Sequence, residues 1–328
     1  MRSLRPSPVA SVRALACVAI PFALLGAAIP RTMLQGPTVL QRSPVMRTGA
    51  ERAGAILYVL VNNGQQGSYV ALYHAYAKKE AAPFAKITSG IDNPGALWVD
   101  AAGNLYVAND LTYTSSVNVY PPGQLKPSTE YTSDVDLPFG GTVDRSNNLY
   151  VSNAGIPGRN LGGVSVYPPG ASQPDHYLTQ HIHVPHGVAV DPRGNVFVAD
   201  IWGVTYTAVV EFAGGGQTGT VLPLNDLNGG FLEDLKLDAA GDIVVADAEL
   251  NTVRFYSKPY GKESGALRSG LSAPTGLAYG PDGSLFVGNE YVNSVTGNVV
   301  VFAPGSSTPT RTIQAGLAGG VLGVAVSP

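Results

Sequence analysis

Apolar and polar positions recur along residues 96–289 in a pattern that predicts strands joined by tight turns. In Gly187–Asp200 a short apolar segment is followed by a segment rich in Asp, Gly and Asn, and then by a second, alternating apolar segment. This order is typical of two strands around a tight turn. Four relatives occur, at Ala96–Asn109, Gly140–Asn153, Asp234–Asp247 and Gly276–Asn289. Their last residues, at 109, 153, 200, 247 and 289, lie 44, 47, 47 and 42 residues apart, so the chain contains a repeat.

A third strand in each unit is marked by an aromatic residue, and the chain ends complete a sixth unit. The aromatic residues are Tyr120, Tyr167, Phe212, Tyr256 and Phe302. The same spacing leads back to Asn62 and Tyr73, in a first unit that lacks its first strand, and Gly323–Val326 supplies that strand at the other end of the chain. Pairing the two ends would remove an open sheet edge. Residues 54–328 therefore predict an all-β, six-bladed β-propeller with four antiparallel strands per blade, closed by the C-terminal strand in the N-terminal blade.

The repeat G-V-A-V-D-x-x-G-N-x-x-V-A-D, followed by an aromatic third strand, resembles the NHL-repeat class of six-bladed propellers over residues 54–328. That class includes peptide-amide lyases, gluconolactonase-like hydrolases and binding modules, so the resemblance implies the fold and leaves the function open. In the lyases, histidines from three blades hold zinc, and here only His186 occupies such a position. In the hydrolases a Glu, an Asn and an Asp hold a divalent cation, and here Glu233 alone fits.

The first 53 residues resemble export and tether segments rather than propeller. Arg2, Arg5 and Arg13 precede or flank an apolar run from Ala14 to Pro30 that is short for a membrane span. We expect residues 1–30 to be a signal peptide and 31–53 a flexible linker, and the mature protein to be secreted, periplasmic or extracellular without stable membrane insertion. Retention of the leader as an anchor stays open. Cys17 is the only cysteine, so a cleaved protein would have no disulfide.

Charge argues against nucleic acid as a partner. The chain has 20 Lys and Arg and 23 Asp and Glu, and residues 1–53 hold seven of the bases and one of the acids. The remainder therefore carries 13 bases and 22 acids, and it has no basic stripe. Such an acidic surface repels phosphate backbones.

In the propellers that the repeat resembles, the innermost strand comes first and begins on the upper face, where a ligand site would lie. The residues before the first strands are Gly95, Phe139, His186, Glu233, Thr275 and Leu322, and those ending the second strands are Asn62, Asn109, Asn153, Asp200, Asp247 and Asn289. We expect His186, Asp200, Glu233 and Asp247 to converge at the channel mouth and bind a ligand. Asp200, Glu233 and Asp247 are candidate ligands for Ca²⁺ or Mg²⁺, and the alternative is that the repeated Asn and Asp cap turns. The lower turns are expected to be too tight to build a pocket.

Aromatic residues in the upper loops add a second candidate surface. Trp202 and Tyr206, with Tyr113 and Tyr291, are expected to form a platform for a sugar ring or an apolar ligand. The histidine cluster His181, His183 and His186 could bind zinc. However, we expect His181 and His183 on an outer fourth strand, far from the channel, which opposes a common site.

Two hypotheses follow from these residues. The first is a secreted, monomeric binding module that recognises a small polar molecule such as a sugar, or a protein partner, through its upper face and that requires no cofactor. The alternative is a divalent-metal-dependent, lactonase-type hydrolase or lyase. The expectation for the charged cluster is that Glu233→Gln or Asp247→Asn leaves the fold intact, or even stabilises the protein without ligand, while weakening the binding of a cation or of a polar ligand.

Overall fold

The computed structural model describes residues 54–328, apart from 65–66, 78–80, 111–114, 156–161, 204–205, 226, 228–229 and 292–295. The propeller lies within the compact unit Pro37–Pro328. The predicted signal peptide (1–30) and linker (31–53) lie outside the described residues. No helix in the described ranges has the length and hydrophobicity that a membrane crossing requires.

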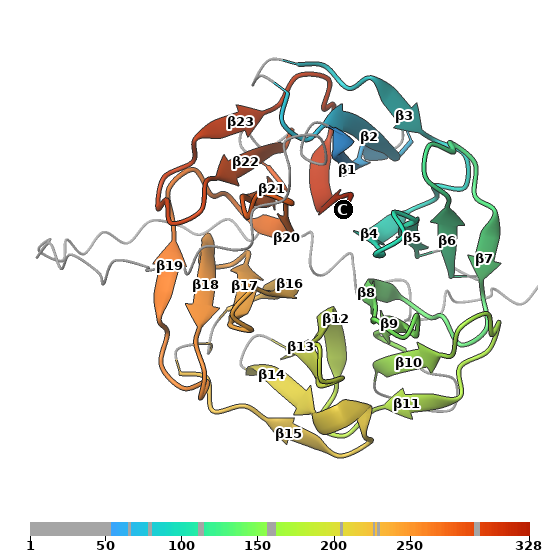
Figure 1. Cartoon of the computed structure of the whole chain (residues 1–328), viewed down its shortest axis with the longest axis vertical. Coiled ribbons are helices and arrows are strands. Elements are labelled where there is room, and N and C mark those ends of the chain that lie inside the picture. The colour runs from blue at the N-terminus through green and yellow to red at the C-terminus, as the bar shows by residue number, and fades with distance from the viewer. Residues whose placement is uncertain are drawn as a thin grey trace, which may run out of the picture. The chain divides into compact units, whose positions relative to one another are not determined.

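Six four-stranded antiparallel sheets form the described part of the chain and are arranged as blades around a ring (Figure 1). From the innermost strand outward, blade 1 contains β24 (Gly320–Val326), β1 (Ile56–Asn62), β2 (Tyr69–His74) and β3 (Ala85–Ile87). Blade 2 contains β4 (Pro94–Val99), β5 (Leu105–Asn109), β6 (Ser116–Tyr120) and β7 (Thr129–Tyr131). Blade 3 contains β8 (Pro138–Val143), β9 (Leu149–Asn153), β10 (Gly163–Tyr167) and β11 (His176–Leu178).

The remaining blades repeat this order. Blade 4 contains β12 (Val184–Val190), β13 (Val196–Trp202), β14 (Tyr206–Phe212) and β15 (Gly219–Val221), with a short 3-10 turn, η3 (Ala213–Gly215), before β15. Blade 5 contains β16 (Leu232–Leu237), β17 (Ile243–Asp247), β18 (Thr252–Tyr256) and β19 (Gly265–Leu267). Blade 6 contains β20 (Pro274–Tyr279), β21 (Leu285–Asn289), β22 (Asn298–Phe302) and β23 (Arg311–Ile313).

The two middle strands of each blade are short and apolar because neighbouring blades cover both of their faces. Every residue of β5, β9, β17 and β21 is buried, including the Asn or Asp that ends the strand. Burial on both faces explains why these segments read as nearly continuous apolar runs. The core consequently lies between the blades, in clusters that combine residues of adjacent sheets.

The turn between the first and second strand is built by its own polar residues. Asp100 Oδ1 accepts hydrogen bonds from the amides of Ala102 (2.9 Å) and Asn104 (2.8 Å), and Gly103 has a φ of +87°. Only a residue without a β-carbon adopts that φ readily, so the Asp-x-x-Gly-Asn spacing encodes the turn. In blade 3 the glycine position is taken by Asn147, at a φ of +63°, which asparagine tolerates better than most residues.

The aromatic residues of the third strands pack between the blades. Tyr73, Tyr120, Tyr167, Phe212, Tyr256 and Phe302 are among the largest fully buried side chains. Where the residue is tyrosine, the hydroxyl also donates to a carbonyl of the segment that enters the blade, as from Tyr120 to Ser89 (2.8 Å) and from Tyr167 to Ser133 (2.6 Å). Each of these tyrosines therefore fixes the crossing from one blade to the next.

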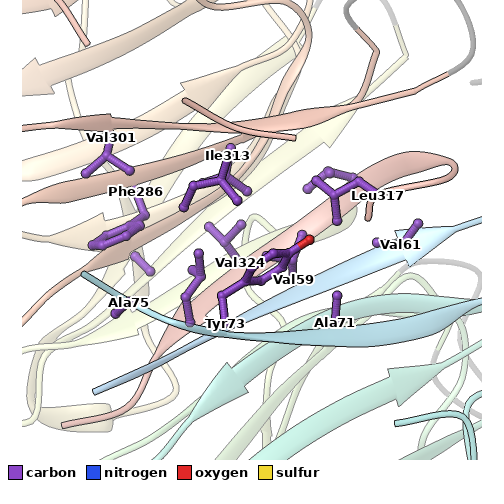
Figure 2. Close-up of a cluster of buried hydrophobic side chains, with 14 of the residues drawn as sticks. Val59, Val61, Ala71, Tyr73, Ala75, Phe286, Val301, Ile313, Leu317 and Val324 are labelled. Carbon is purple, nitrogen blue, oxygen red and sulfur yellow. The ribbon is translucent and has the colours of Figure 1, made fainter. Parts of the chain in front are cut away.

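The ring is closed by pairing of the C-terminal strand β24 with the N-terminal strand β1, which confirms the predicted closure. β24 pairs antiparallel with β1, with Leu57 opposite Val326 and Leu60 opposite Gly323. Figure 2 shows the core behind this seam, where Val59 and Tyr73 of blade 1 face Phe286 and Ile313 of blade 6. The strand is longer than predicted, because Gly320–Leu322 belong to it as well.

Candidate functional site

Two faces of the ring must be distinguished. The loop face carries the starts of the innermost strands and the ends of the second strands, as the pairing of Pro94 with Asn109 shows. The turn face carries the Asp-x-x-Gly-Asn turns. The predicted upper face is the loop face.

On the loop face, the asparagines that end the second strands hold the segments that enter their own blades. Asn109 Oδ1 accepts the amide of Asp92, Asn153 Oδ1 that of Asp136 and Asn289 Oδ1 that of Ser272, at 3.0–3.1 Å and always 17 residues apart. Their Nδ2 groups donate to carbonyls of the same segments, as from Asn109 to Gly90 (2.9 Å). These side chains are buried, so they stabilise the turns that precede the innermost strands.

Asp200 holds the equivalent segment of blade 4, and its partner is a histidine. Asp200 Oδ1 accepts the amides of His183 (2.7 Å) and Val184 (2.9 Å), and Oδ2 lies 2.7 Å from His183 Nδ1. Burial raises the pKa of Asp200, and the hydrogen bonds from His183 oppose that shift. The imidazole is thereby oriented through Nδ1, while 28% of its side-chain surface remains exposed.

Asp247 is compensated in a different way. Its Oδ1 accepts the amides of Phe231 and Leu250 (both 3.1 Å), and its Oδ2 lies 3.2 Å from Nη2 of Arg254, which is itself buried. Blades 2 and 3 have Asn118 and Ser165 at the position of Arg254. The carboxylate and the guanidinium therefore occur together in blade 5, where the other blades have neutral partners.

The four charged residues predicted to converge have different partners in the structure. Asp200 and Asp247 are fully buried and are bonded to their own blades, whereas His186 and Glu233 lie together at the channel. Among the described residues, no three His, Cys, Asp or Glu side chains are placed to hold a metal ion together. Asp200, Glu233 and Asp247 thus do not fit one Ca²⁺ or Mg²⁺ site in this arrangement, and we derive no chemical step through a cation.

His186 and Glu233 form a small aromatic-walled site at the loop-face mouth of the channel. His186 Nδ1 lies 3.3 Å from Glu233 Oε2, and the imidazole stacks on Phe139 (4.8 Å between ring centroids) and meets Phe231 edge-on (5.4 Å). His186 is 6% exposed, whereas the Glu233 side chain is 29% exposed. A polar ligand at this mouth would therefore meet the carboxylate first.

Trp202 and Tyr206, two of the residues predicted to form an aromatic platform, lie opposite each other at the tip of the β13–β14 hairpin. Both rings contact His183, with centroid distances of 5.0 Å to Trp202 and 5.3 Å to Tyr206. β13 and β14 have seven residues each, and the corresponding strands of blades 2, 3, 5 and 6 have five. The paired strands of this hairpin therefore extend to Trp202 and Tyr206. His183, from the segment that enters the blade, completes an aromatic cluster of His183, Trp202 and Tyr206.

The placement of His181 and His183 on an outer fourth strand was wrong. The fourth strand of blade 3, β11, ends at Leu178, and residues 179–183 form the connection to β12. His181 has a φ of +60° in this connection, which then delivers His183 to the loop face. The signal that could have placed His183 is its spacing of 17 residues from Asp200. In three other blades, residues with this spacing connect the end of the second strand to the segment that enters the blade.

Each of three consecutive blades has an exposed apolar side chain near the end of its second strand. Trp202 (48% exposed) ends this strand in blade 4, whereas Leu250 (44%) and Tyr291 (37%) follow it in blades 5 and 6. They are three of the six large apolar side chains that are exposed in the described residues. Tyr113, predicted to belong to the same surface, lies outside the described residues.

A pocket of about 480 Å³ lies at the turn face, where none was expected. It is bounded by the ends of the innermost strands of blades 1, 2, 5 and 6, at Val326, Val99, Leu237 and Tyr279. The turns of blades 2, 5 and 6, and Ser327 and Pro328 after β24, complete the lining. The turns are indeed tight, but the pocket forms between them, at the channel mouth. Spacing within one turn carries no information about the room between turns of different blades.

Comparison with known proteins supports the fold and no narrower identity. No protein-family model matches the chain, and no curated protein matches it. Among solved structures, a chain of a nidogen/laminin complex is similar, with a TM-score of 0.67 and 18% identity over 84% of this chain and 99% of that one. A Bacteroides caccae protein of unknown function is similar with a TM-score of 0.61 and 11% identity, over 83% and 98%. The molecule is thus a six-bladed β-propeller.

Proposed function

We propose that this protein is a binding module that holds a protein partner on its loop face, centred on the aromatic cluster of blade 4. The observation that carries the proposal is an exposed tryptophan on an extended hairpin, braced by a histidine that a buried carboxylate orients. Aromatic side chains with one exposed face dominate the binding energy of many protein interfaces. Leu250 and Tyr291 extend the apolar area across the two following blades.

The structural neighbours are compatible with this proposal. A propeller of the same fold occurs in a nidogen/laminin complex, which is a precedent for a partner on this scaffold and identifies no partner for this chain. The runner-up ligand is a small polar molecule such as a sugar at the Glu233 and His186 mouth. We keep NHL-repeat kinship, export guided by residues 1–30 and a monomeric state as parts of the proposal. A hydrolase or lyase function gains no support from the described side chains.

Site-specific photocrosslinking would test the partner. The protein is expressed in its own host with p-benzoylphenylalanine in place of Trp202, and separately in place of Leu125, which is 45% exposed and lies on the β6–β7 connection. We expect one discrete protein adduct from position 202 and none from position 125. Mass spectrometry of the adduct identifies the partner and the contacted peptide.

Two results would contradict the proposal. Equal adducts at both positions would indicate non-specific contact. The absence of an adduct at position 202 would show that no protein partner binds there. Binding of a sugar that Glu233→Gln weakens would then favour the runner-up, because Glu233 is the exposed carboxylate of that mouth. N-terminal sequencing of the protein recovered outside the cytoplasm would test cleavage of residues 1–30.

A further inference from the structure

The turn-face pocket has the size and lining of a small-molecule site, independently of the proposed function on the opposite face. Its volume of about 480 Å³ falls within the range of ligand sites. Apolar walls come from Val99, Leu237, Pro281 and Val326, and the charged residues of the lining are Asp100 and Asp238. No Lys, Arg or His is among the described residues that line it.

The turn aspartates differ from blade to blade in the donors that reach their outer oxygen, Oδ2. Asp100 Oδ2 accepts Asn104 Nδ2 (2.7 Å) and the Tyr106 hydroxyl (3.2 Å), and Asp144 Oδ2 has the same two kinds of donor. Asp191 Oδ2 accepts Asn195 Nδ2 (2.8 Å). In this series the aspartate is satisfied within its own turn.

Blade 5 lacks both side-chain donors to Oδ2, the asparagine amide and the tyrosine hydroxyl. Asp242 stands where the other turns have asparagine, and Val244 where blades 2 and 3 have tyrosine. Asp238 Oδ1 still accepts the amides of Ala240 (2.8 Å) and Asp242 (2.9 Å), but no side chain of the described residues donates to Oδ2. Asp242 Oδ2 in turn accepts the Ser257 hydroxyl (2.6 Å). The pocket therefore contains a carboxylate oxygen that lacks a side-chain donor.

Tyr279 contributes a second unsatisfied group to the same pocket, from blade 6. Its hydroxyl oxygen is buried and has no hydrogen-bond partner among the described residues, and the residue lines the pocket beside Asp238. Burial of a polar atom without a partner is costly. A group that hydrogen-bonds both oxygens would remove this cost.

The geometry points to a small organic amine as the ligand of this pocket, with its ammonium group on Asp238 Oδ2 and the Tyr279 hydroxyl and its apolar body against Val99, Leu237 and Val326. An ammonium has three N–H donors, so it can bond both oxygens at once. The negative charges of Asp100, Asp238 and nearby Asp242 favour a cation over a neutral hydroxyl ligand. Lys258, the base of this neighbourhood, lies 5.7 Å from the centroid of the Tyr260 ring and does not line the pocket.

The titration behaviour of the pocket residues agrees with this placement. Burial and the charge of Asp242 raise the pKa of Asp238. Burial, followed by the charges of Asp238 and Asp242, raises the pKa of Tyr279. Burial is thus the first cause of both shifts, and the neighbouring carboxylates add to it.

Titration with n-pentylammonium chloride, with 1-pentanol as the neutral isostere, tests the proposal by saturation-transfer NMR on the full chain. We expect saturable, millimolar binding of the amine and binding of the alcohol weaker by about tenfold or more, because a charge-assisted hydrogen bond is lost. Two variants retain the walls. Tyr279→Phe removes only the hydroxyl, and Asp242→Asn restores the Nδ2 donor that occupies Oδ2 in the other turns. Each should weaken amine binding by about tenfold.

The matched control is Asn195→Asp, which creates the same pair of carboxylates in blade 4, outside the pocket lining. This variant should bind the amine as the unmodified protein does. Equal binding of alcohol and amine would overturn the proposal in favour of a hydroxyl ligand. Unchanged amine binding in both pocket variants, or no saturable binding at millimolar amine, would also overturn it and leave an ordered water as the occupant.

Discussion

Single residues on the loop face show why one repeated position of the second strand is aspartate in blades 4 and 5 and asparagine in the other blades. A buried carboxylate is tolerated only when hydrogen bonds or an opposite charge compensate it. Asp200 has His183 as its partner and Asp247 has Arg254, whereas Asn109 and Asn153 meet neutral groups. Where this position is a carboxylate, a histidine or an arginine is its partner, and where it is an asparagine, the partner is neutral.

The first prediction concerns the pair of Asp247 and Arg254. Asp247→Asn leaves a buried guanidinium with the more distant Glu263 (3.8 Å) as its carboxylate partner, and we expect the free energy of unfolding to fall by about 2 kcal/mol. This differs from the sequence-based expectation of an intact or stabilised fold. The double variant Asp247→Asn/Arg254→Asn copies Asn109 and Asn118 of blade 2 and should lose less. Urea unfolding measures both, and an unchanged midpoint in the single variant would contradict the assignment.

The second prediction concerns Asp242 and pH. Because the pKa of Asp238 is raised from 3.8 in the folded protein, ionisation of Asp238 above that raised pKa costs folding free energy. Asp242→Asn removes the neighbouring charge and adds a donor, so stability at neutral pH should rise by about 1 kcal/mol. The gain should shrink as the pH falls through the raised pKa, because protonation of Asp238 removes its repulsion from Asp242. Thermal unfolding across this range tests the sign, and a gain that grows at acid pH would refute it.

At the scale of elements, the β13–β14 hairpin is the departure from the repeat that bears on function. Its tip rests on His183, which is fixed by Asp200 in the segment that enters the same blade. The exposed cluster is thus connected to the core through one imidazole. A hairpin tip with few other contacts in the described residues should respond locally when that link is cut.

The third prediction therefore concerns His183→Ala. Loss of the imidazole should increase amide exchange at residues 200–206 and shift Trp202 emission to longer wavelength, while the strands of blades 1 and 2 keep their protection. Trp202→Ala is the companion variant, with an expected loss of stability below about 0.5 kcal/mol because the side chain is largely exposed. Hydrogen exchange with mass spectrometry checks both variants. Exchange that rises uniformly in all six blades would show that His183 supports the whole ring.

At the scale of the whole molecule, stability depends on closure. β24 supplies the innermost strand of blade 1 and contacts β20 of blade 6 as well as β1 and β4. The seam cluster includes Val321 and Val324 of this strand beside Val59 and Val61. Removal of the strand would expose two sheet edges and open this core.

The fourth prediction is the effect of deleting residues 323–328. The truncated chain loses several buried apolar side chains, so its free energy of unfolding should fall. We expect its unfolding temperature to fall by about 10 °C or more. It should also aggregate at its exposed seam. Deletion of residues 31–53, expected from the sequence to be a linker, is the control and should leave the unfolding temperature unchanged. Equal melting of both truncated proteins would contradict closure by β24.

Local spacing in the sequence was sufficient for the blades, their turns and their order. Asp100, Gly103 and Asn104 specify a turn by hydrogen bonds and one left-handed residue, which are local interactions that recur wherever the spacing recurs. Tyr120 and its counterparts could be assigned to inter-blade packing for the same reason. The candidate site was predicted less well, because ring position placed Asp200 and Asp247 near the channel without indicating which way their side chains point.

The sequence by itself therefore determined the six-bladed ring, its closure and the two faces, since these follow from periodic local patterns and from the complementary ends of the chain. Only the tertiary structure decided which side chains meet. It paired Asp200 with His183, Asp247 with Arg254 and Glu233 with His186, and it opened a pocket between the turns of three blades and the end of β24. The physical reason is that contacts within a blade are fixed by register, whereas the space between blades depends on the packing of all the innermost strands around the ring.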